Sequence, residues 1–417
     1  MSTKITPQSH DLGIRENLSH RESLSRRSFC QLLTAGAATS LLMGCEQGAK
    51  LPNNQIAKAE RPLVQASGPL FVSGLKDTNV AEQPYFLGVF NQSGEIISRA
   101  QLPSRGHQVI DVPNKPNKVL AFARRPDNWL LEVDALSGEI SQQFTTKSNH
   151  HLFGHGCFNR SGQYLFTTEN AYPANIPTKA EHGKIVVRDS SNYQIVAEYD
   201  SGGIGPHQCE LMPDGKTLVI ANGGIYTHPA KPREKLNLAT MAPNLSYMDI
   251  ASGKIIGRYQ PQHFQSSLRH LAVSKTGQVI VGIQQQNKAG LMVPLIVSHR
   301  GEDQLMPMQG DENLWREFNH YTASVCINDD ATIAAVSSPR GNITSYWQLS
   351  DLSLLAKHKY RDGAGVSFYQ DAFVLTNGHG RIVGSQPALT QTQARVKRDT
   401  WSQHLNIQWD NHVAKVS

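Results

Sequence analysis

The stretch GPHQCELMPDGKTLVIANGG, residues 205–224, has the pattern of a β-hairpin. A first strand from His207 to Met212 leads into Pro213-Asp214-Gly215-Lys216, where Gly supplies the positive φ that a tight turn needs. The second strand, Thr217-Leu-Val-Ile-Ala-Asn222, is apolar and rich in residues that favour strands. Pairing about this turn predicts that His207 lies opposite Asn222.

Reduced copies of this hairpin recur along the chain. Clear copies start at His155 and His270, and weaker ones at His107, Ser324 and Gly365. A seventh start, His412, stands near the C-terminus with no second strand after it. The starts are about 40 to 60 residues apart, a period typical of the four-stranded blades of a β-propeller.

The second strand that His412 lacks can be found at the other end of the repeats. Gly68-Pro-Leu-Phe-Val-Ser-Gly74 looks like a second strand without its first. If the two segments pair, the sheets close into a ring that leaves no exposed edge. The sequence therefore predicts an all-β protein, a seven-bladed β-propeller over residues 68–417, closed by pairing of the C-terminal strand with the N-terminal blade.

Two segments depart from the regular blade pattern. Residues 387–401 are poorly patterned, and we expect blade seven to end near Asn406-Ile-Gln408. Blade four carries the longest insertion, residues 225–244, and long connections in compact β-proteins are often functional. We expect a lid there; its candidate residues are Tyr226, His228, Arg233, Lys235 and Asn237.

The N-terminal segment has the pattern of an export signal. Ser25-Arg26-Arg27-Ser28-Phe29 resembles the twin-arginine signature, and the apolar stretch that follows, residues 32–43, is short for a membrane span. We therefore expect residues 1–45 to be a signal for export to the periplasm, with Arg26 and Arg27 as its recognition residues.

The end of this signal resembles a lipobox. Leu42-Met43-Gly44-Cys45 predicts lipidation of Cys45; the alternative is an ordinary cleavage nearby, with Cys45 incidental. Residues 46–67 are polar and contain Pro52 and Pro62, as a flexible tether would. The protein is then expected to meet the membrane only through a lipid anchor.

Charge argues against a nucleic-acid partner. The formal net charge of +6 is small for a chain of 417 residues, and the body has no basic run that would follow a phosphate backbone. We expect a monomer whose partner is a protein or a small ligand at the channel mouth.

Three cysteines outside the leader each stand two residues after a repeat start. At the matching positions of the other repeats the residues are small or Val, so Cys157, Cys209 and Cys326 are interpreted as packing residues. Metal ligation by these thiols is the alternative.

The repeat starts are the candidate functional residues. First strands line the channel of a propeller, and five of the seven starts are His: His107, His155, His207, His270 and His412. Second strands return to the same mouth, where their polar ends and neighbours form a candidate rim: Arg124, Glu169, Asn170, Asn222, Arg269, Gln284, Gln285, Arg340 and Asn377.

Converging imidazoles suit copper, iron or zinc, and Arg124, Arg269 and Arg340 suit a carboxylate. The alternative is structural. Gly106-His107 and Gly154-His155 resemble the Gly-His pair of WD-class propellers, whose imidazole hydrogen-bonds within its own blade.

Several long runs also carry a family resemblance. SGGIGPHQCELMPDGKTLVIANGGIYTHP, KLNLATMAPNLSYMDI, SLRHLAV, SSPRG and WDNH, with the twin-arginine leader, resemble an exported bacterial β-propeller family labelled domain of unknown function 1513. The resemblance covers residues 68–416 and implies a periplasmic propeller encoded near imelysin-type and di-haem oxidoreductase-like proteins linked to iron acquisition. It implies no catalytic residue.

Two functions follow as hypotheses. The first is an exported periplasmic propeller that binds a ligand or serves as a scaffold in an iron-related envelope system. The alternative is a metal-dependent oxidoreductase that uses copper or iron at the His-lined mouth. The second requires at least three His side chains within coordination reach of one point, and the sequence leaves open whether the protein is an enzyme.

Overall fold

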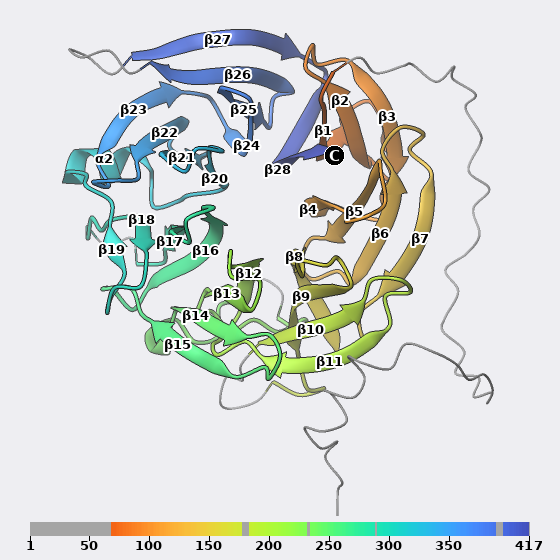
Figure 1. Ribbon diagram of the computed structural model, residues 1–417, viewed down its shortest axis with the longest axis vertical. Helices are drawn as coiled ribbons and strands as arrows, with labels where there is room; N and C mark the ends of the chain where they lie inside the picture. The colour runs from red at the N-terminus through yellow and green to blue at the C-terminus, as the bar shows by residue number, and fades with distance from the viewer. Residues whose placement is uncertain (1–67, 177–182, 232–233, 288–289, 389–394, 417) are drawn as a thin grey trace, which may run out of the picture. The chain divides into compact units, whose positions relative to one another are not determined.

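The computed structural model describes residues 68–176, 183–231, 234–287, 290–388 and 395–416. These residues form seven four-stranded antiparallel sheets, which follow one another around a common axis as the blades of a propeller (Figure 1). The predicted all-β, seven-bladed fold is confirmed. The predicted signal and tether, with Arg26, Arg27 and Cys45, lie outside the described residues.

Within each blade, the strands follow in order from the innermost to the outermost. Blades one to four are β28 (Ile407–Val416), β1 (Leu70–Asp77), β2 (Tyr85–Asn91) and β3 (Ile96–Gln101); β4 (Gly106–Asp111), β5 (Lys118–Ala123), β6 (Trp129–Asp134) and β7 (Ile140–Thr145); β8 (His150–Phe158), β9 (Tyr164–Ala171), β10 (Lys184–Asp189) and β11 (Ile195–Asp200); β12 (Pro206–Leu211), β13 (Thr217–Asn222), β14 (Asn244–Asp249) and β15 (Ile255–Tyr259).

The remaining blades follow in chain order. Blades five to seven are β16 (Ser266–Val273), β17 (Val279–Gln285), β18 (Ile296–His299) and β19 (Met306–Pro307); β20 (Val325–Ile327), β21 (Ile333–Ser338), β22 (Ile343–Gln348) and β23 (Leu354–Lys359); β24 (Gly363–Tyr369), β25 (Ala372–Asn377), β26 (Arg381–Ala388) and β27 (Arg395–His404). Two short helices complete the described secondary structure, the 3₁₀ helix η1 (Leu238–Thr240) and α2 (Glu312–Glu317).

The ring closes as the repeat pattern predicts. β28 pairs antiparallel with β1, in a register that runs from Leu70 opposite Val416 to Asp77 opposite Ile407. Trp409 and Val413 of β28 pack with Phe71 of β1 in one buried cluster. The first blade is therefore built from both ends of the described chain, and its innermost strand is the last one in sequence.

The hairpin in blade four has the predicted turn and a shifted register. Gly215 has a φ of 68°, and the Asp214 carboxylate accepts hydrogen bonds from the backbone N–H groups of Lys216 and Thr217. The partner of Asn222 is Pro206, however, and the register jumps between Pro206 and Gln208. The predicted pairing of His207 with Asn222 is therefore wrong, because His207 occupies a β-bulge.

Burial changes from the inner to the outer strands of a blade. In β5, Val119 to Ala123 are all buried, because neighbouring blades cover both faces of an inner strand. In the outer strand β7 the side chains alternate between partly buried and exposed. The core therefore lies between the blades, where, for example, Trp315 of α2 stacks on Trp347 of β22 with ring centroids 5.6 Å apart.

Blade seven differs from its predicted outline. The poorly patterned stretch contains most of the strand β27, whereas Ile407 and Gln408 begin the closing strand and do not end blade seven.

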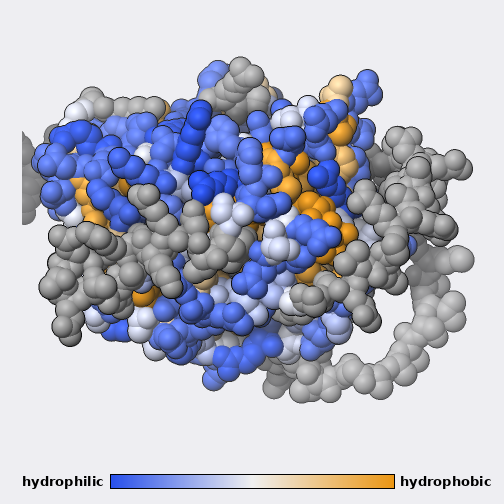
Figure 2. Space-filling model, turned by 90° about the horizontal axis from the view of Figure 1, so that it is seen from above, coloured by the Kyte–Doolittle hydropathy of each residue, from blue (hydrophilic) through white to orange (hydrophobic). Residues whose placement is uncertain are grey.

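Among the described residues, no helix is long and apolar enough to cross a membrane. Hydrophilic residues dominate the face shown in Figure 2, and hydrophobic residues gather there in separate patches.

Candidate functional site: a His cluster beneath a cationic cavity

Each of the five predicted His residues lies in a β-bulge of an innermost strand. In each of these innermost strands, the register of pairing with the second strand is interrupted around the His. The interruptions lie between Gly106 and Val109, Leu152 and Gly156, Pro206 and Gln208, Leu268 and Leu271, and, in β28, between Trp409 and Val413. A bulge bends its strand and re-aims a side chain. The repeated bulge is therefore the local reason why these side chains leave the sheet and point to the axis.

The five imidazoles meet at the axis, and we call them the His cluster. The Nε2 atom of His412 lies 3.1 Å from that of His155 and 3.2 Å from that of His270, and the Nε2 atoms of His207 and His270 lie 3.1 Å apart. His107 faces His155 with ring centroids 4.6 Å apart. One ligand atom each of His107, His155, His207 and His270 lies within 4.8 Å of the others.

Two blades contribute no His to the cluster. At the equivalent positions they have small residues, which leave room for the imidazoles of the other blades. The equivalent positions are Ser324 and Gly365. The Ser324 hydroxyl donates a hydrogen bond to the carbonyl of Asn411, and a Cβ on Gly365 would lie 3.2 Å from the backbone nitrogen of Val413. His270 and His412 can then face each other across this gap, with centroids 4.6 Å apart.

Contacts between blades hold the imidazoles. His270 Nδ1 lies 2.7 Å from the carbonyl oxygen of Ala323, which can only accept, so Nδ1 carries the proton. Gln108 accepts a hydrogen bond from the backbone N–H of Gly156 in the next blade, and Gln208 does the same for Leu271. The hydrogen bonds of the cluster therefore run between blades, unlike those of the WD-type Gly-His pair.

The surroundings keep the cluster neutral. Burial, followed by the neighbouring imidazoles, holds the pKa of His155, His207 and His412 well below the ordinary value. Burial alone would raise the pKa of the Asp410 carboxyl, but His107 and Arg105 hold it well below its usual range. Neutral imidazoles retain a lone pair, which is the form that ligates metals.

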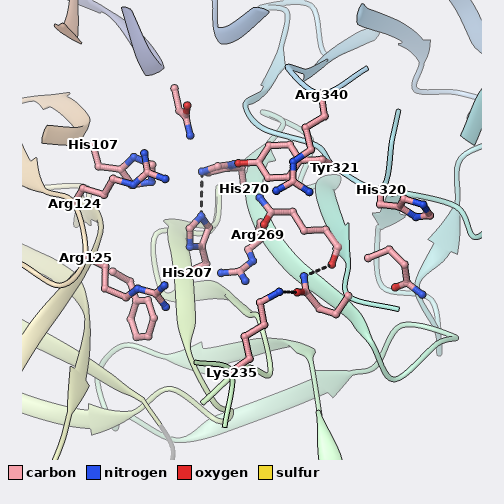
Figure 3. Close-up of a pocket in the computed structure, with 15 residues that line it drawn as sticks. His107, Arg124, Arg125, His207, Lys235, Arg269, His270, His320, Tyr321 and Arg340 are labelled. Atoms are coloured by element: carbon pink, nitrogen blue, oxygen red, sulfur yellow. Dashed lines mark hydrogen bonds between the residues drawn. The ribbon is translucent and has the colours of Figure 1, made fainter. Parts of the chain in front are cut away.

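A cavity of about 340 Å³ opens directly on the cluster, and we call it the mouth cavity. His107, His207 and His270 form part of its lining. Its other polar side chains include those of Arg124, Arg125, Lys235, Arg269, Arg340 and Gln285. Figure 3 shows the four guanidinium groups turned toward the same space. Among the described residues, no Asp or Glu lines this cavity.

The arginines of the mouth cavity lie close together, and none of the described residues supplies a carboxylate partner for them. Burial and then the charge of Arg125 lower the pKa of Arg269 to about 10, and burial with Arg124 lowers that of Arg125. Arg124 Nη1 and Arg269 Nε are buried and have no hydrogen-bond partner among the described residues. Arg340 stacks on the ring of Tyr321, 4.4 Å from its centroid. Such a set of donors suits an anion.

The structure divides the candidate rim into two groups. Arg124, Arg269, Gln284, Gln285 and Arg340 line the mouth cavity. The others lie in hydrogen-bond networks inside or between blades: Glu169 with Arg188 and His150, Asn170 with His151 and Thr227, Asn222 with Ser201 and Asn244, and Asn377 with Arg361. Sequence position alone did not separate these two groups.

The candidate lid is packed against the propeller at its start, whereas Lys231, Glu234 and Lys235 are exposed. Tyr226 and His228 are buried, and His228 Nε2 lies 2.8 Å from the carbonyl oxygen of Pro173. The Asn237 side chain accepts a hydrogen bond from the backbone N–H of Tyr226 and donates one to Gly224. Lys235 reaches the mouth cavity, where it donates to Gln286, and Arg233 lies outside the described residues.

Among the described residues, the group of converging ligand atoms contains four His and no Cys. Cys157 and Cys209 are buried on neighbouring innermost strands with their Sγ atoms 4.0 Å apart. Contact with Cys209 and burial raise the pKa of the Cys157 thiol, and burial raises that of Cys326 to about 12. Protonated thiols in this setting behave as packing residues.

A second cavity, of about 440 Å³, lies on the other side of the His cluster. His270 and His412 line it, together with Glu210, whose pKa burial raises to about 7. Because His270 borders both cavities, the cluster separates them along the axis.

Several residues of the site were missed from the sequence. Arg125 directly follows the candidate Arg124, so the basic pair was a usable signal. Outside the site, the sequence shows no spaced partner for His150, yet its Nδ1 lies 2.9 Å from the Glu169 carboxylate. Tyr321 and Asp410 reach the site through loop geometry and a bulge, which no local pattern indicates.

The fold and these two cavities define a seven-bladed β-propeller with a His-lined axis. The chain belongs to the family described as "Protein of unknown function (DUF1513)", whose model matches residues 100–416. No curated protein matches the chain.

A solved structure titled "Kuenenia stuttgartiensis Hydrazine Synthase" contains a similar chain. The likeness has a TM-score of 0.52 at 12% sequence identity and covers 76% of this chain and 90% of that chain. At this identity the likeness shows the fold alone.

Proposed function

We propose that this protein is a ligand-binding propeller that takes a small polyanion, a multiply charged carboxylate or phosphate, into the mouth cavity. The observation that supports this role is the set of four arginines and one lysine around a cavity with no Asp or Glu among its described lining residues. Guanidinium groups bind both anion types through paired charge-assisted hydrogen bonds. A buried anion would give an acceptor to Nη1 of Arg124 and Nε of Arg269, for which the described part of the chain supplies none.

Calorimetric titration of the protein with citrate and with inorganic phosphate, at low ionic strength, tests this proposal. We expect Arg269→Gln and Arg340→Gln each to weaken the binding of the preferred anion about 10- to 100-fold, the range for lost hydrogen bonds to a charged group. Arg258→Gln, on the exposed face of β15, removes the same charge elsewhere and is the matched control. Undetectable binding of both anions, or equal losses in all three variants, would refute the proposal.

We also propose that the protein works in the periplasm, exported by its twin-arginine leader and anchored through Cys45. This setting rests on the leader sequence, and the family resemblance suggests an iron-related envelope system. Cell fractionation of Arg26→Lys/Arg27→Lys should show loss of export, and Cys45→Ala should release the protein from the membrane fraction. Unchanged fractions in both variants would contradict this location.

A scaffolding role would add a protein partner at the mouth, and no nucleic acid. In this role the chain is a monomer that presents the cationic mouth to an acidic surface. Cross-linking in cells, with a photoreactive residue in place of Lys235, would identify such a partner, and the same residue in place of Arg258 is the control. Identical cross-links at both positions would argue against it.

The second candidate function is a metal-dependent oxidoreductase with copper or iron at the His cluster. The observation that favours it is the approach of four imidazole ligand atoms to within 4.8 Å of one another. It requires redox turnover in addition to metal binding. A protein that binds copper or iron, but shows no reversible potential by voltammetry, would not support this function.

A further inference from the structure

The Nε2 contacts of the His cluster cannot all be hydrogen bonds. His155, His412, His270 and His207 form a chain of three Nε2 contacts of 3.1, 3.2 and 3.1 Å. The Nε2 atom of a neutral imidazole has either one proton or one lone pair. An atom in the middle of this chain therefore makes one proper hydrogen bond, and at most two of the three contacts can be satisfied.

The position of the proton on His270 further limits which Nε2 contacts can be hydrogen bonds. Its Nδ1 donates to the carbonyl oxygen of Ala323, so its Nε2 presents a lone pair. His207 and His412 would then both have to donate to that one lone pair. If His412 donates its Nε2 proton to His270, it has no second Nε2 proton to donate to His155.

A cation that accepts lone pairs removes the conflict. With metal–nitrogen bonds of about 2.0 to 2.1 Å, ligand nitrogens 3.1 to 3.2 Å apart correspond to angles of about 100° at the metal. That value lies near the tetrahedral angle. In many metal sites, a backbone carbonyl accepts a hydrogen bond from the non-ligating nitrogen of a His ligand. The carbonyl of Ala323 accepts such a bond from His270 Nδ1, and this leaves Nε2 to face the metal.

We propose that the His cluster is a binding site for one first-row transition-metal ion, Cu²⁺, Zn²⁺ or Fe²⁺, ligated by Nε2 of His155, His207, His270 and His412. His107 also brings a ring nitrogen within 4.8 Å of those of His155, His207 and His270, and its Nδ1 lies 3.9 Å from Asp410. Imidazole ligands suit these three ions, and copper is expected to bind most tightly. This site rests on the second candidate function, which places a metal at the His cluster, and it is separate from anion binding because its ligands are not the arginines of the mouth cavity.

The location of the site connects it to both cavities. His207 and His270 border the mouth cavity, and His270 and His412 border the second one. An ion at this point is shielded from bulk water by the imidazoles yet can be reached from the mouth. A small anion in the mouth cavity would lie beside the ion, so we expect metal and anion each to strengthen the binding of the other.

The test uses the full chain, exported through its own leader, purified without a His tag and stripped with a chelator. Equilibrium dialysis against Cu²⁺, Zn²⁺ or Fe²⁺, followed by plasma mass spectrometry, gives the stoichiometry. Electron paramagnetic resonance of the Cu²⁺ form gives the number of coordinated nitrogens. We expect one ion per chain and a spectrum with at least three nitrogen ligands.

Variants separate this site from adventitious binding. His155→Asn and His270→Asn are each expected to weaken binding at least about 100-fold, more than the usual loss of an outer-shell partner. His404→Asn is the matched control, because His404 is exposed on β27 and lines neither of the two cavities. Thermal unfolding followed by circular dichroism shows whether each variant folds.

The outcomes are distinct. Sub-stoichiometric binding by the wild type, a Cu²⁺ spectrum with fewer than three nitrogens, or unchanged affinity in His155→Asn and His270→Asn would overturn the metal site. If the variants do not fold, the wild-type stoichiometry and nitrogen count decide alone. Arg269→Gln should weaken anion binding about 10- to 100-fold and leave metal binding unchanged, so failure of the anion proposal can be told from failure of this one.

Discussion

His155 and His412 are 257 residues apart in sequence, and their Nε2 atoms lie 3.1 Å apart. One side chain comes from blade three and the other from the strand that closes blade one. The His cluster is therefore complete only in a closed ring, and the stability of the closure and the geometry of the site depend on the same strand.

Deletion of residues 407–417 should open the ring. It removes β28, exposes the edge of β1 and removes Trp409 and Val413 from their buried cluster. An exposed edge strand pairs readily with other chains, so size-exclusion chromatography should show oligomers or aggregates. His412→Asn keeps the strand and should remain a monomer. A truncated protein that stays monomeric with the wild-type unfolding temperature would contradict closure of the ring through β28.

Gly154→Ala should disturb the bulge that aims His155. Gly154 has a φ of 98°, where L-residues are strained, and a Cβ there would lie 2.6 Å from Cδ2 of His107. Backbone strain of this kind costs about 1–3 kcal/mol, and His107 must also move. We expect a lower unfolding temperature by calorimetry, together with weaker metal binding. Gly290→Ala, which meets no atom within 4 Å at a similarly positive φ, measures the backbone cost alone.

Glu169 should prove to be a structural residue. Its carboxylate is fully buried and pairs with Arg188 at 2.8 Å. Arg188→Met leaves this charge without its cation, a loss of about 3–5 kcal/mol, visible as a lower urea midpoint. Arg188→Met/Glu169→Gln should recover much of that loss. If Glu169→Gln instead weakens anion binding and leaves the urea midpoint unchanged, Glu169 belongs to the ligand site.

Glu132 should make stability depend on acid pH. Burial alone would raise the pKa of Glu132, but hydrogen bonds from Lys115, Tyr193 and Ser141 lower it below its usual value. A carboxylate whose pKa is lower in the folded state stabilises the protein above its unfolded pKa of about 4.3, and this contribution is lost as pH falls through the folded value.

Glu132→Gln should therefore be less stable than the wild type at pH 7, by about 1–3 kcal/mol. The difference should narrow as the pH falls from about 5 to about 3, because protonation removes the advantage of the wild type. Thermal unfolding across this range measures both proteins. A difference that stays constant with pH would show that the charge of Glu132 contributes nothing.

The three cysteines of the propeller should be unreactive while the protein is folded. The Cys157–Cys209 contact and burial raise the pKa of Cys157, burial raises that of Cys326, and the Cys209 side chain is buried. Maleimide should label them only after unfolding in urea, and peptide mapping distinguishes them from Cys30 and Cys45. Rapid labelling of Cys157 or Cys209 in the native protein would contradict this assignment.

The blade count and the closure of the ring followed from sequence because both depend on local patterns. Apolar strands around turns with a positive-φ Gly, such as Gly215, recur along the chain, and two half-hairpins remain at its ends. The five axial His residues were predicted for the same reason, since each occupies the same place in its repeat.

Only the tertiary structure decided how these residues face one another. A β-bulge at His207 shifts the register, so that His207 does not pair with Asn222 as expected. A bulge inserts one extra residue into a strand, and the composition of the strand does not reveal this insertion. Among the rim candidates, Arg269 and Asn222 both stand near blade starts or ends, yet one lines the mouth cavity and the other binds Ser201 and Asn244. Repeats determine which strand a residue occupies, whereas the contacts of a side chain depend on neighbouring blades far away in sequence.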